Sequence, residues 1–408
     1  RANVRTYKHQ FEKVIEYGNL AKAINRSSLR KRDRDDVYDV FLNPDKHIKK
    51  IIKQLLEQTW KPRKHRAEVI NDGITQKKRL IIRPDFCYEQ VIHHAVIQVM
   101  QPIFYKGMYE YSCGSIPDRG ATLGQKHIEK YIRKNNISNP PKNCKWNKSN
   151  IKYVLKLDIH HFFQSININI LKQKFADKIK DERMLWLLNT ILQSNIVSFE
   201  GQDVDIGLPI GYYTSQWFAN WYLQDLDHFI KEKLHIRCYV RYMDDMIMFG
   251  KNKKELKCCL EKIREFLKTL DLDIKGNWQI FRFDYIDKNG KRKGRPLDFI
   301  GFKFYRDKTI LRKPIMYKAT RKASKLEKKE KLTWYDACQV LSYMGYFKHS
   351  DTWLIREKYI AKKISIKACK SVISKHSKSL NLQKKQNSDK IKEKGEQNGD
   401  NIQKSRKD

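Results

Sequence analysis

The sequence predicts an α+β protein in which an antiparallel sheet packs on helices. Apolar residues recur at helical spacing near both ends of the chain, in residues 8–60 and 315–373. Between these parts, runs rich in β-branched and aromatic residues are bounded by turn residues, most clearly in 66–84 and 238–250. The 408 residues, of which 40% are hydrophobic, suffice for one large domain or two to three smaller ones.

The charge balance of the chain is strongly basic. Its 85 Lys and Arg residues against 46 Asp and Glu residues give a formal net charge of +39, which indicates a polyanionic partner, either nucleic acid or an acidic membrane. No apolar run approaches the roughly 20 residues that span a bilayer, and no signal peptide is visible. We therefore expect an intracellular, cytoplasmic protein that binds nucleic acid and no membrane. The eight cysteines include no CxxC pair, so a zinc site of the usual spacing is not expected.

The N-terminal third begins with helices, which we expect over residues 8–60. Two strands follow within 67–83, joined around Asp72-Gly73, a dipeptide typical of hairpin turns. A helix over about 86–101 comes next, because apolar residues again recur at helical spacing there.

The middle of the chain alternates helices and short strands. A glycine-rich loop at 111–120 precedes a helix, an arrangement that can hold phosphate but is a weak signal by itself. Residues 134–150, rich in Asn, Lys and Pro, are expected to form a surface insertion. In chain order the expected elements are helix 121–133, strand 153–158, helices 171–180, 183–193 and 215–233, hairpin 238–250 and helix 253–270.

The C-terminal part is basic. Short strands are expected in 273–285 and 297–312, followed by helices over 315–373 in which Thr333 is a plausible N-cap. Residues 374–408 contain almost no large apolar side chains, so we expect a disordered tail that cannot bury enough surface to fold.

The pair Asp244-Asp245 is the most informative feature of the chain. It lies within Cys238–Gly250, an apolar and aromatic run that otherwise reads as a hairpin. Adjacent carboxylates at such a turn repel each other, and a divalent cation bound between them would offset this cost. The alternative is an exposed Asp-Asp turn, which is common in hairpins.

A third acid, Asp158, ends the expected strand 153–158. Two-metal phosphoryl transfer needs carboxylates that hold two cations about 3.5–4 Å apart. A sheet that places strand 153–158 beside hairpin 238–250 would bring these three acids together, so the sequence favours such a site.

At this point four segments, taken together and in order, make the chain recognisable. The chain resembles a reverse transcriptase over about residues 10–350. In chain order the matching segments are Leu157-Asp158 with Phe162-Phe163, Gly207-Leu-Pro-Ile-Gly211 with Ser215-Gln216, Tyr242-Met-Asp-Asp245, and Leu297-Asp-Phe-Ile-Gly-Phe302. They are similar to the first acidic motif, the nucleotide-facing loop and helix, the polymerase active-site hairpin and the primer-grip hairpin.

This resemblance implies a right-hand polymerase fold with fingers, a palm whose antiparallel sheet packs on helices, and a helical thumb. The implied organisation is an N-terminal helical extension (1–65), fingers (66–152), palm with interleaved fingers helices (153–312), thumb (313–373) and a disordered basic tail (374–408).

The resemblance also implies roles for the acids. Asp158, Asp244 and Asp245 correspond to the catalytic carboxylates, which bind two Mg²⁺ ions that Mn²⁺ can replace. The backbone carbonyl of Ile159 is a further candidate metal ligand.

Seven residues are implied to contact the incoming deoxynucleotide. Phe163, five residues after Asp158, matches the steric gate, where a bulky ring collides with a ribose 2′-hydroxyl. The others are Lys78 and Arg79, which match fingers residues that grip the triphosphate, then Ile210, Gly211 and Gln216 of the loop and helix, and Lys275, which would protonate pyrophosphate. Read without the resemblance, the two basic residues are solvated strand charges, Phe163 is core and Lys275 is surface.

The type of reverse transcriptase is left open. Ile210 and Ser215-Gln216 resemble the diversity-generating retroelement enzymes, which implies misincorporation opposite adenine because isoleucine cannot form the hydrogen bonds that glutamine would. The alternative is a bacterial or phage-encoded defence enzyme with a structured non-coding RNA template, an accessory protein or protein priming. The expected partners are an RNA template, a DNA or RNA primer and deoxynucleotides. A non-enzymatic alternative is a nucleic-acid-binding protein with an inactive polymerase fold.

Overall fold

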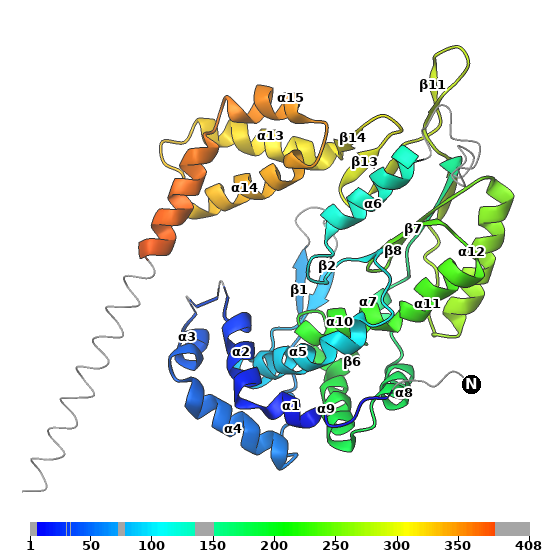
Figure 1. Cartoon of the computed structure of the whole chain (residues 1–408). Coiled ribbons are helices and arrows are strands. Elements are labelled where there is room, and N and C mark those ends of the chain that lie inside the picture. Colours follow the sequence, from blue (N-terminus) through cyan, green and yellow to red (C-terminus); the bar gives the residue numbers. More distant parts are fainter. Residues whose placement is uncertain (1–5, 30, 33, 72–77, 135–150, 380–408) are drawn as a thin grey trace, which may run out of the picture. The chain divides into compact units, whose positions relative to one another are not determined.

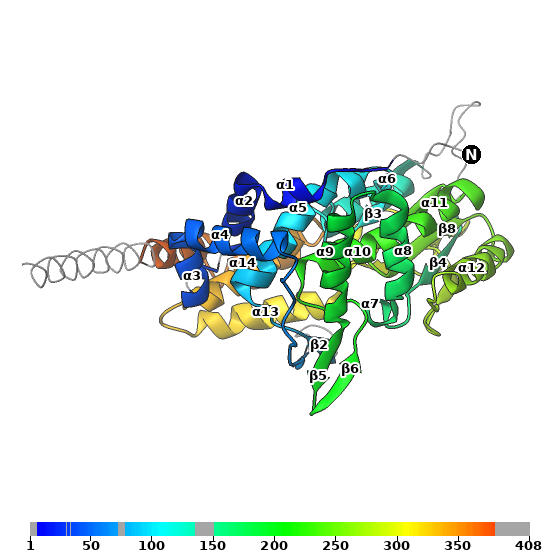
Figure 2. The ribbon, with the colours of Figure 1, turned by 90° about the horizontal axis from the view of Figure 1, so that it is seen from below.

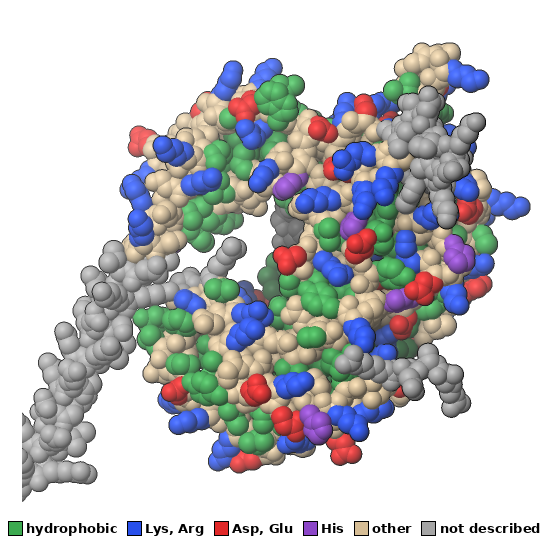
Figure 3. Space-filling model, viewed as in Figure 1, with side chains coloured by type: hydrophobic (Ala, Val, Ile, Leu, Met, Phe, Trp, Pro, Cys, Tyr) green, Lys and Arg blue, Asp and Glu red, His purple; other side chains and the backbone are tan. Residues whose placement is uncertain are grey.

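The computed structural model describes residues 6–29, 31–32, 34–71, 78–134 and 151–379. The chain divides into two compact units, Arg1–Ile300 and Gly301–Asp408 (Figures 1 and 2). Lys and Arg side chains are spread over the visible face of each unit (Figure 3). Within the described ranges, we find no helix with the length and apolar character that crossing a bilayer requires.

The N-terminal part of the first unit is helical, as predicted for residues 8–60. Its helices are α1 (Phe11–Ile15), α2 (Tyr17–Ser27), α3 (Asp35–Leu42) and α4 (Pro44–Leu56). Pro44 occupies the first position of α4, where its missing N–H costs no helical hydrogen bond. The predicted helix over 86–101 is present as a π-helical turn, Phe86–Gln90, followed by α5 (Val91–Tyr105), on which α2 packs.

A five-stranded sheet lies at the centre of the first unit, in the order β3-β7-β8-β4-β9. Its strands are β3 (Ser112–Cys113), β4 (Tyr153–Leu157), β7 (Cys238–Tyr242), β8 (Asp245–Gly250) and β9 (Gln279–Arg282). Neighbouring strands are antiparallel, as predicted, except that β3 runs parallel to β7. Because Leu157 of β4 pairs with Met246 of β8, the end of β4 lies beside the start of β8.

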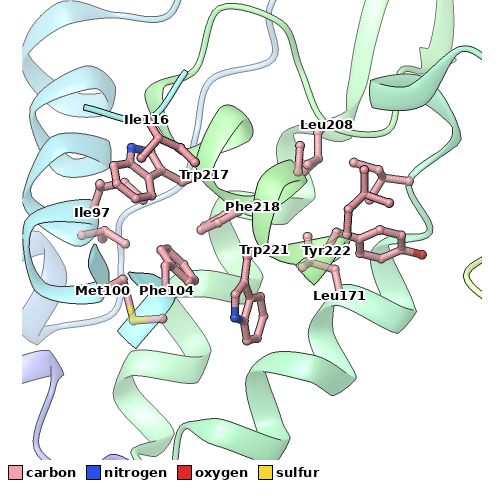
Figure 4. Packing of buried hydrophobic residues seen from close by; sticks show 14 of the residues in the cluster. Ile97, Met100, Phe104, Ile116, Leu171, Leu208, Trp217, Phe218, Trp221 and Tyr222 are labelled. Carbon is pink, nitrogen blue, oxygen red and sulfur yellow. The ribbon is translucent and has the colours of Figure 1, made fainter. Parts of the chain in front are cut away.

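Helices pack on this sheet and build the main core. α6 (Ala121–Lys134) packs against β3 and β7, whereas α12 (Lys253–Lys268) packs against β4, β8 and β9. The core continues into a cluster of large side chains from α5, α8 (Ile168–Lys178) and α10 (Tyr213–Tyr222) (Figure 4). There the rings of Phe104 and Phe175 lie 5.4 and 5.1 Å from that of Trp221. These contacts fix α10, which begins directly after the 207–211 loop.

Three small hairpins extend from the first unit. β1 (Glu68–Asn71) pairs with β2 (Lys78–Ile81) as predicted, although the turn at Asp72-Gly73 lies outside the described residues. β10 (Tyr285–Ile286) pairs with β11 (Arg292–Lys293). The β5–β6 hairpin (Ile196–Phe199 and Gln202–Asp205), which projects from the helices in Figure 2, was not predicted.

Other elements of this unit are α7 (Phe162–Ser165), α9 (Glu182–Leu192), α11 (Gln224–His228) and β12 (Leu297–Phe299). The expected insertion at 134–150 lies outside the described residues apart from Lys134.

The second unit begins with a hairpin and continues with helices. Its elements are β13 (Phe302–Phe304), β14 (Thr309–Leu311), α13 (Lys313–Glu327), α14 (Trp334–Lys348) and α15 (Trp353–Arg356). Thr333 caps α14 as predicted, through a reciprocal capping box with Asp336. A further helix covers 366–379. Residues 374–379 are therefore helical rather than disordered, and the rest of the expected tail lies outside the described residues.

Candidate active site

The turn of the β7–β8 hairpin carries Asp244. Tyr242 and Asp245 are the last pair of the ladder, so Met243 and Asp244 form a two-residue turn between them. Met243 has a φ of 56°, the left-handed conformation that a tight hairpin turn demands. Its amide N–H donates to the Cys113 carbonyl at 3.0 Å, which ties the turn to β3.

Asp158 lies beside this turn, because it directly follows β4. Burial first, and then the negative charges of Asp158 and Asp245, raise the pKa of Asp244 to about 7. Asp158 Oδ1 is buried and has no hydrogen-bond partner among the described residues. The structure therefore brings two acids that follow different strands into one place, where the charge of Asp158 disfavours the ionised form of Asp244.

The chemistry of these acids fits a divalent cation. Carboxylate oxygens are preferred ligands of Mg²⁺, and a cation would compensate both the repulsion and the unpartnered Asp158 Oδ1. In the part of the chain that the structure describes, no three His, Cys, Asp or Glu side chains already converge as ligands of one ion. Asp158 and Asp244 are thus the core of the candidate site, and the contributions of Asp245 and the Ile159 carbonyl remain predictions.

Lys275, which the resemblance implies as a nucleotide contact, lies next to Asp158. Its amide N–H donates to the Asp158 carbonyl at 2.8 Å, and its Nζ is 3.6 Å from Asp158 Oδ2. The neighbouring pair Ile159–Ile274 forms an antiparallel bridge, and the His160 amide donates to the Asp273 carbonyl at 2.8 Å. Backbone pairing of two short segments therefore fixes the distance between the lysine and the acid.

Phe163 lies directly under the 207–211 loop. Its carbonyl accepts a hydrogen bond of 2.8 Å from the Leu208 amide. Gly207 has a φ of 57°, and a Cβ on it would lie 2.3 Å from the Phe163 carbonyl oxygen. Only glycine permits this close approach, so the loop and the partly exposed Phe163 ring keep a fixed relation.

Ile210 and Gly211 join the loop to the β1–β2 hairpin. The Ile82 amide donates to the Ile210 carbonyl at 2.9 Å, and Ile82 directly follows β2. Lys78 and Arg79 are exposed on β2. The structure therefore connects their strand to the 207–211 loop.

Gln216 lies on the exposed side of α10, one turn after the loop. Its carbonyl accepts a hydrogen bond of 3.1 Å from Asn220 Nδ2, so its backbone is fixed while its side chain faces solvent. Of the predicted nucleotide contacts, Ile210, Gly211 and Gln216 thus share the loop and the helix that follows it, and Phe163 of α7 lies under the same loop.

The glycine-rich loop at 111–120 supports the Met243–Asp244 turn. Gly114 has a φ of 95°, and a Cβ on it would lie 3.0 Å from Met243 Cγ. The sequence motifs did not identify Arg241 as part of the site, although it is fully buried beneath the turn. The available signal was an arginine inside an apolar strand, because a buried charge requires a partner.

Helices packed on a sheet that holds Asp158 beside the Asp244 turn define a polymerase of the right-hand class. The chain belongs to the reverse transcriptase (RNA-dependent DNA polymerase) family, which its residues 61–304 match. The predicted family and fold class are thereby confirmed.

Two individual proteins show the range of this similarity. The retron Ec73 reverse transcriptase of Escherichia coli is 30% identical over 148 residues, which cover 33% of this chain and 44% of that protein. The chain thus matches less than half of the length of this curated relative. The apo telomerase of Candida tropicalis, truncated from its C-terminal domain, shares 14% identity and a TM-score of 0.42 over 62% of this chain and 56% of that one.

Proposed function

We propose that the chain is an RNA-directed DNA polymerase that extends a DNA or RNA primer with deoxynucleotides on an RNA template. The observation that carries the proposal is the meeting of Asp158 and Asp244 at a rigid hairpin turn, in a member of this family. The net charge of +39 supports a nucleic-acid substrate.

The acids would act through bound cations. Asp158, Asp244, Asp245 and the Ile159 carbonyl would hold two Mg²⁺ ions, or Mn²⁺ in their place, which when bound activate the primer 3′-hydroxyl and neutralise the triphosphate. The chain itself orients the acids through the pairing of β4 with β8. Lys275, whose Nζ lies 3.6 Å from Asp158 Oδ2, would donate a proton to the departing pyrophosphate.

The nucleotide would lie against the loop and the fingers hairpin. Lys78 and Arg79 would bind the triphosphate, since guanidinium and ammonium groups pair well with phosphate oxygens. Phe163, held under Gly207, would exclude a 2′-hydroxyl. Ile210, Gly211 and Gln216 would form the surface that faces the sugar and the base.

Primer extension on a defined RNA template tests this proposal. We expect the wild-type chain to incorporate deoxynucleotides with Mg²⁺, and Asp244→Asn and Asp245→Asn to lose incorporation while still binding RNA. Asp203→Asn is the matched control, because Asp203 of the β5–β6 hairpin is exposed and forms an ion pair with Lys64. If the wild type incorporates nothing with Mg²⁺ or Mn²⁺ and any supplied primer, the chain is a nucleic-acid-binding protein with an inactive polymerase fold.

A finer proposal concerns fidelity. Ile210 offers no side-chain hydrogen bond near the incoming nucleotide, which supports error-prone synthesis opposite adenine, as in diversity-generating retroelements. Sequencing of cDNA copied from a defined RNA decides this point. An error rate at adenines no higher than at other bases rejects it, and Ile210→Gln should lower the rate if the proposal holds.

The retron reverse transcriptase relative supports a bacterial retroelement enzyme, and leaves both diversification and defence as roles. The defence alternative predicts a structured non-coding RNA template, an accessory protein or protein priming. Sequencing the RNA that co-purifies with the chain identifies the template. Nucleic acid that stays attached to the chain after denaturation would establish protein priming.

A further inference from the structure

Arg241, the residue before the Tyr242–Asp245 motif, makes a buried ion pair with Asp227 of α11. Both side chains are 0% exposed. Arg241 Nε donates to Asp227 Oδ1 at 2.8 Å and Nη2 donates to Oδ2 at 2.6 Å, so the pair is bidentate. The Tyr239 hydroxyl also donates to Asp227 Oδ1, at 2.7 Å. The charge of Arg241 is therefore neutralised inside the protein.

The remaining N–H groups of Arg241 reach the Met243–Asp244 turn, helix α10 and strand β3. Nη1 donates to the Met243 carbonyl and to Asn220 Oδ1, both at 3.0 Å. Nη2 donates to Ser112 Oγ at 2.6 Å. With the two bonds to Asp227, all five N–H donors of the guanidinium have acceptors.

Asn220 of α10 extends this network. Its Nδ2 donates to the Gly114 carbonyl at 3.1 Å and to Met243 Sδ at 3.3 Å. Met243 is thus held at its carbonyl by Arg241, at its sulfur by Asn220 and at its amide by the Cys113 carbonyl. Three elements, β7, α10 and β3, converge on one residue of the turn.

We infer that Arg241 is a positioning residue that sets the conformation of the turn and thereby the cation site at Asp158 and Asp244. The inference rests on the proposed function. The Met243 carbonyl and the Asp244 amide belong to one peptide unit, so a bond to this carbonyl restrains the orientation of Asp244. Met243 has a left-handed φ of 56°, and a residue other than glycine keeps such a conformation where its surroundings enforce it.

Lysine cannot replace Arg241 in this role. An ammonium keeps the charge that balances Asp227, but it has three donors and no planar fork. It therefore cannot reach both Asp227 oxygens together with Met243, Asn220 and Ser112. Arg241→Lys separates the positioning role from the mere presence of a buried charge.

The test uses the full chain and three variants. Arg241→Lys removes the fork, and Ser112→Ala removes one bond at the far end of the network with little change in volume. Arg264→Lys is the matched control, because Arg264 forms an ion pair with Glu261 on the surface of α12. For each variant, primer extension gives kcat, the KM for deoxynucleotide and the Mg²⁺ concentration at half-maximal rate. Thermal unfolding with and without Mg²⁺ gives a readout that does not depend on activity.

We expect Arg241→Lys to lower kcat about tenfold or more, which corresponds to about 1.4 kcal/mol in the barrier, and to raise the half-maximal Mg²⁺ concentration severalfold. The KM for deoxynucleotide should stay within about twofold, and the Mg²⁺-dependent rise in Tm should shrink. Ser112→Ala should change kcat, the half-maximal Mg²⁺ concentration and the Mg²⁺-dependent rise in Tm in the same direction by a smaller factor. If Arg241→Lys does not fold, Ser112→Ala tests the positioning role in its place. Arg264→Lys should behave as the wild type.

A lower Tm for Arg241→Lys with unchanged kcat and Mg²⁺ dependence would overturn the inference and leave Arg241 a structural residue. If the wild type incorporates no nucleotide but gains stability from Mg²⁺, and Arg241→Lys lacks this gain, the proposed function fails and the positioning role stands. If Mg²⁺ stabilises both chains equally, or neither, the positioning role is rejected.

Discussion

Gly211 lies so close to Ile82 that a Cβ atom on it would be 2.1 Å from the Ile82 carbonyl oxygen. The adjacent hydrogen bond, from the Ile82 amide to the Ile210 carbonyl, is 2.9 Å long. Gly211 also has a φ of 128°, which L side chains rarely adopt. The end of strand β2, which carries Lys78 and Arg79, is therefore held against the 207–211 loop through a glycine that no other residue can replace without displacement.

Gly211→Ala is expected to separate these two segments. The backbone clash and the unfavourable φ together should cost on the order of 1–3 kcal/mol, and the displaced hairpin should raise the KM for deoxynucleotide. Thermal unfolding and primer extension measure the two effects. Gly120→Ala is the control, because no atom lies within 4 Å of its added Cβ. Equal stability and equal KM in the two variants would show that the close approach has no consequence.

Asp244 is expected to make the stability of the metal-free chain depend on pH. Burial and the nearby Asp158 and Asp245 raise its pKa in the folded state to about 7, from a reference value of 3.8. Between these values the folded state holds a proton that the unfolded state releases, so the free energy of unfolding falls as pH rises from about 4 to about 7. Asp244→Asn lacks this contribution and should be more stable than the wild type at pH 8 without divalent cations.

Thermal unfolding in EDTA across this pH range provides the measurement. Adding Mg²⁺ at pH 8 should raise the Tm of the wild type, because the cation binds the ionised carboxylates, and should remove its lower stability relative to Asp244→Asn. The same Mg²⁺ concentration should raise the Tm of Asp244→Asn by less. Asp203→Asn serves as the control for a surface carboxylate. A stability difference between wild type and Asp244→Asn that stays constant with pH would contradict the assigned environment of Asp244.

The acids of the candidate site could be predicted from the sequence because the residues next to each acid already indicate its position. Asp158 ends a strand and Asp244 lies at a hairpin turn, and one sheet then brings them together. The partners of Arg241 could not be predicted, because Asp227 and Ser112 lie on separate elements and their residue types are ordinary on a surface. The approach of Gly211 to Ile82 likewise depends on the packing of distant segments.

The β5–β6 hairpin was missed for a different reason. Its second strand, Gln202–Asp205, is polar and largely exposed, so it has neither the β-branched composition nor the alternation that marks a strand. Its turn uses Glu200 and Gly201, which have φ values of 50° and 82°. Glu-Gly is not among the dipeptides that signal such turns, so backbone geometry alone reveals the hairpin.

Phe163 is expected to select the sugar. Phe163→Ala removes the ring that would collide with a 2′-hydroxyl, so the preference for deoxynucleotides over ribonucleotides should fall by roughly tenfold or more. The ratio of kcat/KM for dATP and ATP on an RNA template measures this preference. Phe162→Leu is the control, because Phe162 is a neighbouring ring that is buried in the core. Phe162→Leu should lower the stability of the protein and leave the ratio of kcat/KM for dATP and ATP unchanged. If Phe163→Ala also leaves this ratio unchanged, Phe163 is not part of the nucleotide site.

Asp336 is expected to control the stability of the second unit. Its side chain is buried, accepts from Lys322 Nζ at 2.8 Å and pairs with Lys329, and closes the capping box with Thr333. Hydrogen bonds from Lys322 first, then from Lys329 and Thr333, hold the pKa of this carboxyl well below its usual range. Because the pKa of Asp336 is lower in the folded state than in the unfolded state, the ionised carboxylate stabilises the fold above about pH 4. This stabilisation is lost as the pH falls towards the pKa of Asp336 in the folded state.

Asp336→Ala should therefore lower the free energy of unfolding of the second unit by about 2–4 kcal/mol at pH 7. The difference from the wild type should shrink below about pH 4, because the wild-type carboxylate then begins to lose its advantage. Thermal unfolding of the full chain at several pH values, followed by circular dichroism, measures the effect. Glu330→Ala is the control for an exposed acid near the same helix. A difference that does not depend on pH would mean that Asp336 acts by packing alone, and no difference at all would remove the capping box as a stabilising feature.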